Sequence, residues 1–439
     1  MAATSLSARQ ILAYGVLGFP LAFAALPLYV HVPRLYADSV GLPLAVVGAV
    51  LLLTRFADAL IDPLLGQWSD RLGNRRRLIA FALPLLALGL AALLTPPATG
   101  GTTWLVLSLI VTFAGFSLAT INYHAWGAEL GATPKESIRV TSVREMFALG
   151  GVVVAAALPS LLANDVATAM RHLGWVFLPL LALAALATLA GAPLTPAAAA
   201  TSSASRQLPL TAVFADRHFR RLLVVLAVGG IASAIPATLV LFFIADVLRL
   251  QEWQGLFLVI YFVCGGLALP GWVMLARRHG KVVAWAVSMV LAIGSFVWAF
   301  LLDAGDGIAF GVICAASGAA LGAELALPPA LLADRLAEGR RNSTPDAPAA
   351  GAGTYFGVWN FVTKFNLALA AGIALPLVSL GGYEVGAGDA LKEVPLGDTA
   401  SSAGLLALAA TYALLPAAIK VISLLLLWRW KNDFEGATP

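Results

Sequence analysis

Charged residues are scarce in this chain of 439 residues: they make up 11% of it, where soluble globular proteins carry about 25%. Hydrophobic residues make up 60%, and the mean hydropathy is +0.89. Apolar runs of roughly 20 residues, the length of a membrane-crossing helix, recur along the whole sequence. These features exclude an ordinary soluble protein, and they also exclude a β-barrel, which would be built from short alternating segments.

Cysteine is nearly absent. The chain has two, Cys264 and Cys314, and both lie inside apolar runs, so the sequence offers neither a disulfide framework nor a cluster of metal ligands. We therefore expect no cofactor and no bound metal. The net charge of +4 is spread over short gaps between apolar runs instead of forming a basic domain, so we expect no nucleic-acid partner.

The apolar runs predict an all-α membrane protein with twelve transmembrane helices, acting as a monomer in the lipid bilayer. The first run is too long for the core of a signal peptide and is interpreted as a retained helix. The expected spans are 11–32, 43–65, 78–96, 103–126, 140–162, 173–192, 221–245, 253–275, 282–302, 308–332, 354–380 and 403–428.

The basic residues predict the orientation of these spans. With the N-terminus placed in the cytoplasm, 19 of the 27 Lys and Arg residues lie on the cytoplasmic side and four on the other side, the remaining four being inside spans. Positive charge marks the cytoplasmic side of a membrane protein. We therefore expect a multi-pass protein of the cell inner membrane with both termini in the cytoplasm.

A low-complexity segment divides the predicted spans six and six. It lies in 193–220 and reads as a cytoplasmic linker between an N-terminal half, 1–192, and a C-terminal half, 221–439. Short motifs correspond faintly across it: the gap after Gly66 resembles the gap after Gly271, and Glu129 corresponds to Asp334. Two such halves predict a transporter built by duplication, with its site near the bilayer midplane.

The gap after the second span carries a spaced motif, GQWSDRLGNRRR from residue 66. A glycine there lets another helix pack closely, an aspartate can cap a helix N-terminus, and arginines hold the cytoplasmic end. The alternative is a mere cluster of positive charge. The motif resembles the loop signature of the major facilitator superfamily, which implies a gating and structural role for Gly66, Asp70, Arg71, Gly73, Arg75 and Arg76.

The second span also contains charged residues that an apolar segment has to accommodate. Asp58 and Asp62 share one helix face, and Arg55 lies one turn earlier on it. Two carboxylates at low dielectric cannot both ionise easily, so they either take up a proton or hold a cation between them. The alternative is a structural ion pair of Arg55 with Asp58.

The sequence RFADALIDP from residue 55 resembles the glycoside-pentoside-hexuronide:cation symporter family, of which melibiose permease is a member. The resemblance continues in both halves, at Asn122–Leu130, Arg144, Ala333–Asp334, Tyr355–Gly357 and Lys364. It implies the major facilitator fold with two six-helix halves and a coupling cation at Asp58 and Asp62. It also implies a sugar site at Asn122, Trp126, Arg144 and Lys364, with Glu129 and Asp334 in the structural motifs.

This chain departs from the family pattern at the sugar site. Asn122 stands where melibiose permease has an acid, and Leu21 and Ala22 stand where charged residues are found there. From the residues alone, Trp126 and Asn122 lie one turn apart, and a tryptophan face beside a hydrogen-bonding group suits a sugar ring. Packing is the alternative for a membrane tryptophan.

Glu324 completes the predicted substrate site. Glu324 lies inside an apolar run and is expected to face the solute cavity; the alternative is an ion pair with a basic group of the C-terminal half such as Lys364. Glu145, beside Arg144, is expected to reach a different helix.

The predicted function is secondary active transport of a small polar solute, such as a sugar, glycoside or uronate, coupled to a proton or sodium. A proton is favoured because Ile61 stands where sodium-using members of the family have an asparagine and Asn122 stands where they have an acid, which removes one ligand and one negative charge. An exporter or a lysolipid transporter of the same fold is the alternative. An enzyme is not expected, since no catalytic constellation converges in the spans, and a membrane sensor would carry a signalling domain.

Overall fold

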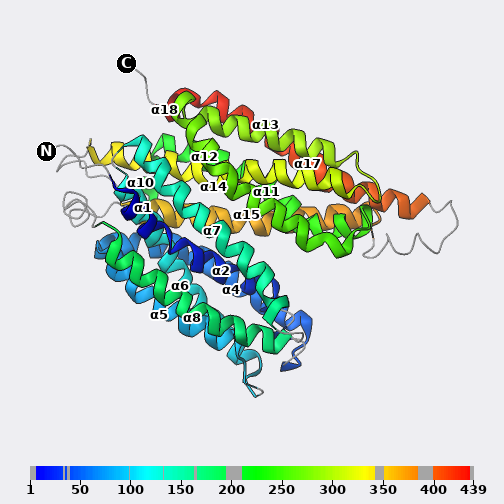
Figure 1. Ribbon diagram of the computed structural model, residues 1–439, viewed down its shortest axis with the longest axis horizontal. Coiled ribbons are helices and arrows are strands. Elements are labelled where there is room, and N and C mark those ends of the chain that lie inside the picture. Colours follow the sequence, from blue (N-terminus) through cyan, green and yellow to red (C-terminus); the bar gives the residue numbers. More distant parts are fainter. Residues whose placement is uncertain are drawn as a thin grey trace. The chain divides into compact units, whose positions relative to one another are not determined.

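The computed structural model describes residues 6–32, 35–36, 40–97, 99–131, 133–162, 166–193, 210–341, 351–383 and 399–435. Regular structure in this part of the chain is entirely helical (Figure 1). The α-helices up to the predicted linker are α1 (Ala8–Gly15), α2 (Gly18–Val30), α4 (Leu44–Leu72), α5 (Arg75–Leu94), α6 (Gly101–Leu130), α7 (Pro134–Leu162) and α8 (Val166–Gly191).

The remaining elements follow the same plan. They are α10 (Leu210–Ala215), α11 (Arg217–Phe242), a π-helical turn η1 (Phe243–Val247), a 3₁₀ turn η2 (Gln251–Trp253), α12 (Gln254–His279), α13 (Lys281–Ala299), α14 (Gly307–Arg341), α15 (Ala352–Leu380), α17 (Thr399–Arg429) and α18 (Lys431–Glu435).

Ten helical segments in the described residues are long and apolar enough to cross a membrane. The other two predicted spans, 43–65 and 140–162, coincide with α4 and α7, helices of 29 residues each. These two helices carry the charged residues of the predicted site in their apolar stretches, which lowers their hydropathy. The all-α membrane fold expected from the sequence is confirmed, and its boundaries follow the apolar runs.

The first predicted span is broken in the structure. Helix α1 ends at Gly15 and α2 begins at Gly18. The Tyr123 hydroxyl donates to the carbonyl oxygens of Tyr14 at 2.8 Å and Gly15 at 3.0 Å, while the Tyr14 hydroxyl donates to the Tyr123 carbonyl at 2.8 Å. The two bonds donated by Tyr123 of α6 satisfy backbone carbonyls at the break, where the helix itself does not.

The described chain forms two compact units. Unit 1 consists of residues 1–219 and 329–361, and unit 2 consists of 220–328 and 362–439. Helices α14 and α15 therefore each contribute residues to both units. The predicted boundary at 193–220 lies mostly outside the described residues, and the division into halves at that point stays a prediction.

Glycines allow close helix packing in both units. In unit 1, a Cβ atom on Gly115 would lie 2.4 Å from the backbone nitrogen of Leu86, which brings α5 and α6 into backbone contact. In unit 2, a Cβ atom on Gly318 would lie 2.1 Å from the carbonyl oxygen of Tyr261, between α14 and α12. Such contacts hold membrane helices together, because lipid offers no hydrophobic drive for their association.

Candidate functional site

The acids of α4 are buried in unit 1. Asp58 is 8% exposed, and one of its carboxylate oxygens accepts a hydrogen bond of 2.7 Å from the Ser117 hydroxyl of α6. Asp62 is fully buried one turn later on the same helix. Arg55 directs its guanidinium to the Leu28 carbonyl oxygen of α2, 3.5 Å away. Helix α4 thus presents two buried carboxylates on one face, as the spacing predicts.

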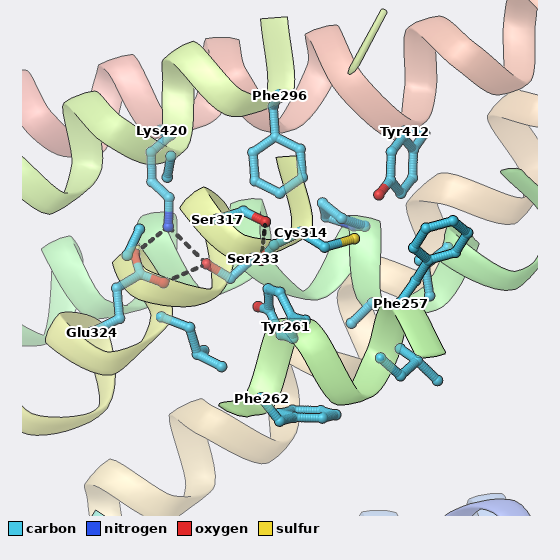
Figure 2. A pocket seen from close by; sticks show the side chains of 17 residues that line it. Ser233, Phe257, Tyr261, Phe262, Phe296, Cys314, Ser317, Glu324, Tyr412 and Lys420 are labelled. Carbon is cyan, nitrogen blue, oxygen red and sulfur yellow. Dashed lines mark hydrogen bonds and ion pairs between the residues drawn. The ribbon is translucent and has the colours of Figure 1, made fainter. Parts of the chain in front are cut away.

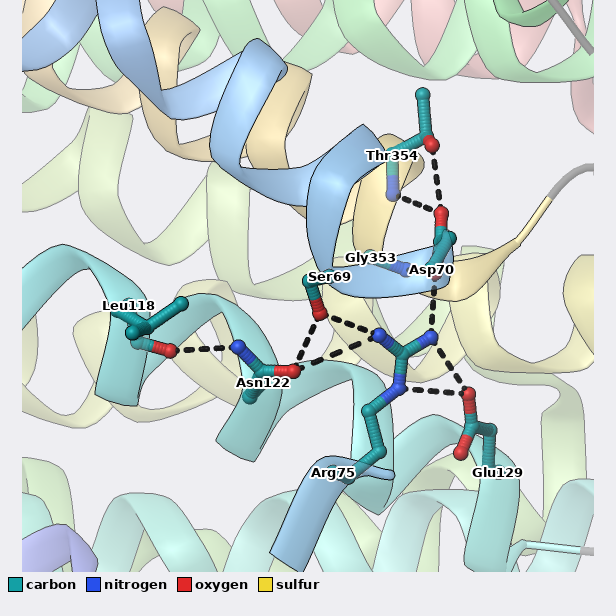
Figure 3. A network of polar contacts seen from close by, with 8 residues as sticks. All are labelled: Ser69, Asp70, Arg75, Leu118, Asn122, Glu129, Gly353 and Thr354. Atoms are coloured by element: carbon teal, nitrogen blue, oxygen red, sulfur yellow. Dashed lines mark hydrogen bonds and ion pairs between the residues drawn. The ribbon is translucent and has the colours of Figure 1, made fainter. Parts of the chain in front are cut away.

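The loop after α4 centres on the Arg75 guanidinium (Figure 3). Arg75 is 4% exposed and donates to Glu129 of α6, at 3.1 Å from Nε and 2.9 Å from Nη2. It also donates to the Ser69 hydroxyl at 2.6 Å and pairs with Asp70. Arginine suits this position because its planar fork satisfies several acceptors at once.

Asp70 caps the start of α15. Its carboxylate accepts from the backbone N–H groups of Gly353 at 2.8 Å and Thr354 at 2.7 Å, and from the Thr354 hydroxyl at 2.6 Å. A carboxylate is well placed there, since it satisfies free N–H groups and the positive end of the helix dipole. The helix that Asp70 caps is therefore one that lies far from it in the sequence.

Gly66 makes this approach possible. A Cβ atom at position 66 would lie 2.1 Å from the Gly353 carbonyl oxygen, closer than any real contact. One turn earlier on α4, the Asp62 carbonyl lies against Gly357 of α15 in the same way, at 2.5 Å from an added Cβ. The first two turns of α15 are therefore seated on the backbone of α4.

The other motif residues shape the turn. Gly73 adopts the left-handed conformation, with φ of 66°, and ends α4, while the Asn74 side chain accepts from the Arg77 backbone N–H and begins α5. Arg71 is exposed in the last turn of α4. Arg76 lies 6.0 Å from the centre of the Trp126 ring, within the range of a cation–π contact.

Asn122 and Trp126 pack beside this loop motif. Asn122 is fully buried; its side-chain oxygen accepts from Ser69, and its amide donates to the Leu118 carbonyl at 2.8 Å. Trp126 is also fully buried and meets Tyr14 edge-on at 5.8 Å. The Trp126 indole N–H is buried and has no hydrogen-bond partner among the described residues, and contact of Trp126 with a solute stays a prediction.

Arg144 lies at a cavity of ≈ 150 Å³ in unit 1, between α2, α6 and α7. The prediction that Glu145 reaches a different helix is wrong: Arg144 donates to Glu145 at 2.8 Å from Nε and 2.6 Å from Nη2. The pair forms because Arg144 is 3% exposed and needs a counter-charge. Thr120, His124 and Leu21 also line this cavity.

Glu324 lines a second cavity, inside unit 2. Its carboxylate pairs with Lys420 of α17 and accepts a hydrogen bond of 2.7 Å from Ser233 of α11 (Figure 2). The sequence interpretation considered Lys364 as the partner and overlooked Lys420. The signal was present, because Lys420 interrupts the longest apolar stretch of the last span.

Lys364 and Asp334 are both half-buried, in α15 and α14. Asp216, an acid that the sequence interpretation missed, forms a cluster in unit 1. It accepts from Arg335 at 3.1 Å and Tyr355 at 3.1 Å, and it caps α11 through the His218 backbone N–H at 3.0 Å. Burial raises the pKa of Asp216, but the Arg335 charge and these hydrogen bonds outweigh it, so the pKa lies below its usual value.

Residues 11–433 match the family described as MFS/sugar transport protein. The chain belongs to this family. Its members are transporters. The buried acids, the glycine contacts and the loop motif are thus parts of a major facilitator carrier.

Relatives of this carrier include proteins named as symporters. The chain is 35% identical over 151 residues to the uncharacterized symporter YnaJ of Bacillus subtilis (strain 168), a match covering 32% of each chain. It is 32% identical over 177 residues to the uncharacterized symporter sll1374 of Synechocystis sp. (strain ATCC 27184 / PCC 6803 / Kazusa), covering 36% of this chain and 32% of the relative. Each match therefore spans about a third of the relative's length.

Solved structures share the fold of this carrier over nearly its whole length. A bacterial homologue of the iron transporter ferroportin, outward-facing, has a TM-score of 0.68 at 15% identity and covers 97% of this chain and 100% of its own. The E. coli fucose:proton symporter FucP has a TM-score of 0.64 at 15% identity and covers 98% of both chains. The proton:xylose symporter XylE has a TM-score of 0.63 at 12% identity, covering 96% and 94%.

Proposed function

We propose that this carrier moves a small, uncharged polar solute of sugar size by alternating access, in symport with a proton. The observation that carries the proposal is the cavity at Arg144, beside the face of α6 that also bears Ser117 and its bond to Asp58. The named relatives are symporters, and two of the solved neighbours are sugar:proton symporters.

The charge of the cavity favours a neutral solute. The Arg144 guanidinium is compensated by Glu145 at 2.6 Å, so a uronate would have to displace an existing carboxylate. Breaking a buried ion pair to admit another anion costs several kcal/mol. Hydroxyl groups, in contrast, can accept from the guanidinium and donate to the carboxylate together, since each hydroxyl is both donor and acceptor.

A proton fits the surroundings of Asp58 better than sodium does. Hard cations need several oxygen ligands. The Ile61 side chain offers no oxygen, and the Asn122 side-chain oxygen already accepts from the Ser69 hydroxyl and, at 3.5 Å, from the cationic Arg75 guanidinium. A proton needs a single carboxylate held at low dielectric.

Transport assays in proteoliposomes test coupling. After a thermal-shift screen of monosaccharides, methyl glycosides and uronates identifies a ligand, its uptake is followed under an inward proton gradient. We expect Asp58→Asn to abolish accumulation while leaving solute exchange, because the neutral amide side chain cannot take up and release a proton. Arg144→Ala should abolish binding itself.

The matched control is Asp303→Asn, which removes an exposed acid outside the helices. It should leave uptake unchanged. Accumulation driven by sodium at equal pH would rule out proton coupling, and tight binding of uronates would rule out a neutral solute. Retained binding by Arg144→Ala would remove this cavity as the solute site.

We also propose that the carrier lies in the cell inner membrane as a monomer, with both termini in the cytoplasm. The asymmetry of Lys and Arg supports this orientation. A fluorescent reporter that folds only in the cytoplasm, fused to the C-terminus, should be bright. A dark fusion together with an active periplasmic phosphatase fusion at the same point would overturn the orientation.

A further inference from the structure

The cavity inside unit 2 has a volume of ≈ 160 Å³ and is walled by α11, α12, α13, α14 and α17. Aromatic side chains supply much of the wall: Phe257, Tyr261, Phe262, Phe296 and Tyr412 (Figure 2). Flat aromatic faces pack best against another ring. The interior is therefore suited to a ring-shaped ligand with apolar faces.

One end of this cavity is polar and already neutralised. Lys420, 1% exposed, pairs with Glu324 and donates to the Ser233 hydroxyl at 2.7 Å, and Ser233 donates to Glu324 at 2.7 Å. A charged ligand would lose its hydration without meeting an uncompensated opposite charge. An uncharged ligand with one hydroxyl could instead donate to the carboxylate and accept from the ammonium group.

Few other polar groups are available in the cavity. The Ser317 hydroxyl donates to the Ile313 carbonyl at 2.7 Å. Tyr412 is 4% exposed, and the hydroxyls of Tyr412 and Tyr261 are the other polar groups of the aromatic wall (Figure 2). Each buried hydroxyl left without a partner costs about 1–3 kcal/mol. A sugar, which carries many hydroxyls, is therefore a poor fit, whereas a ring with one hydroxyl can pair it.

We propose that this cavity is a binding site for an uncharged, largely apolar ring molecule with one hydroxyl, of the phenol class. The ring lies among the aromatic side chains, and the hydroxyl lies at the Ser233–Glu324–Lys420 end. This site goes beyond the proposed transport function and is separate from it, because its residues belong to unit 2 and the Arg144 cavity belongs to unit 1.

Cys314 lines the cavity and provides a local reporter. In a Cys264→Ser protein, the rate of its modification by methyl methanethiosulfonate is followed by intact-protein mass, with 4-ethylphenol as the probe. We expect saturating 4-ethylphenol to slow the reaction at least tenfold, and benzoate or glucose to leave it unchanged. The control is the modification rate of the Cys264 thiol in a Cys314→Ser protein, which reports any general effect of the phenol on the detergent micelle.

Two substitutions on α14 separate binding from general effects. Ala320, 2% exposed, lines the cavity, so Ala320→Leu should fill it and abolish binding. Ala316→Leu makes the same change outside the lining and should retain binding. Calorimetric titration of 4-ethylphenol into both variants decides the matter even if Cys314 reacts too slowly to follow.

Equal heats of binding for Ala320→Leu and the unmodified protein would overturn the proposal, as would protection of Cys264 equal to that of Cys314. The Arg144→Ala variant separates this site from the transport site. Binding of 4-ethylphenol should survive in that variant, whereas its loss from protein that still elutes as a folded species in gel filtration would show that the phenol occupies the solute site. Failure of the transport proposal leaves the titration unaffected.

Discussion

Lys420→Met should destabilise unit 2 by about 3–5 kcal/mol, because it leaves the Glu324 carboxylate as an unpaired charge in an apolar setting. Lys420 is 1% exposed and bonds to both Glu324 and Ser233, so its replacement leaves both of these groups without their partner. The reciprocal change, Glu324→Gln, should be destabilising for the same reason, since it strands the ammonium group.

The double variant Glu324→Gln with Lys420→Met is the informative case. Replacing both charges removes the desolvation cost together with the attraction, and exchanges of this kind are often neutral. We expect it to recover most of the stability that either single change loses. Thermal unfolding in detergent can be followed with a fluorogenic maleimide, which reports on Cys264 and Cys314, both in unit 2.

Glu252→Gln serves as the control, because Glu252 is an exposed acid in η2 of the same unit. It should leave the unfolding temperature unchanged. If the double variant loses as much stability as the two single variants together, the two residues act independently, and the ion pair is not what holds α14, α11 and α17 together at this point.

Gly66→Leu should disrupt the contact between the start of α15 and α4. The new Cβ would fall 2.1 Å from the Gly353 carbonyl oxygen, so the two backbones must separate. Overpacking costs about 1–3 kcal/mol, and separation also breaks the hydrogen bonds from Gly353 and Thr354 to the Asp70 carboxylate. The seated arrangement should therefore lose about 3 kcal/mol, which is roughly a 100-fold change in its equilibrium.

Thiol accessibility measures this change. Ala352 is 4% exposed at the first position of α15, and Ala352→Cys in a protein with Cys264 and Cys314 replaced by serine provides the label site. Its alkylation should accelerate at least tenfold with Gly66→Leu. The matched control is Gly48→Leu, on the same helix, where an added Cβ has no neighbour within 4 Å. Equal rates in the two variants would show that Gly66 does not govern the contact.

Hydropathy alone determined that this chain is a helical membrane protein. It also singled out the charged residues that lie inside apolar runs. This information is local: an apolar run long enough to cross a bilayer has to satisfy its backbone internally, and only a helix or a closed barrel does so. That Asp58 and Asp62 share a helix face is also local information, because residues four apart lie about one helical turn apart. The spaced glycine, aspartate and arginines of the loop likewise predicted a structural motif by their pattern.

Tertiary structure decided which side chains meet. Asn122 and Trp126 share a helix face, as predicted, but that face meets Ser69 and Tyr14. Glu324 forms an ion pair with Lys420 on α17, and Arg144 forms one with the adjacent residue Glu145. Periodicity gives the direction of a side chain around one helix, whereas its partner depends on which helix packs there and at what depth. Those are set by contacts such as Gly66 on Gly353, between segments far apart in the sequence.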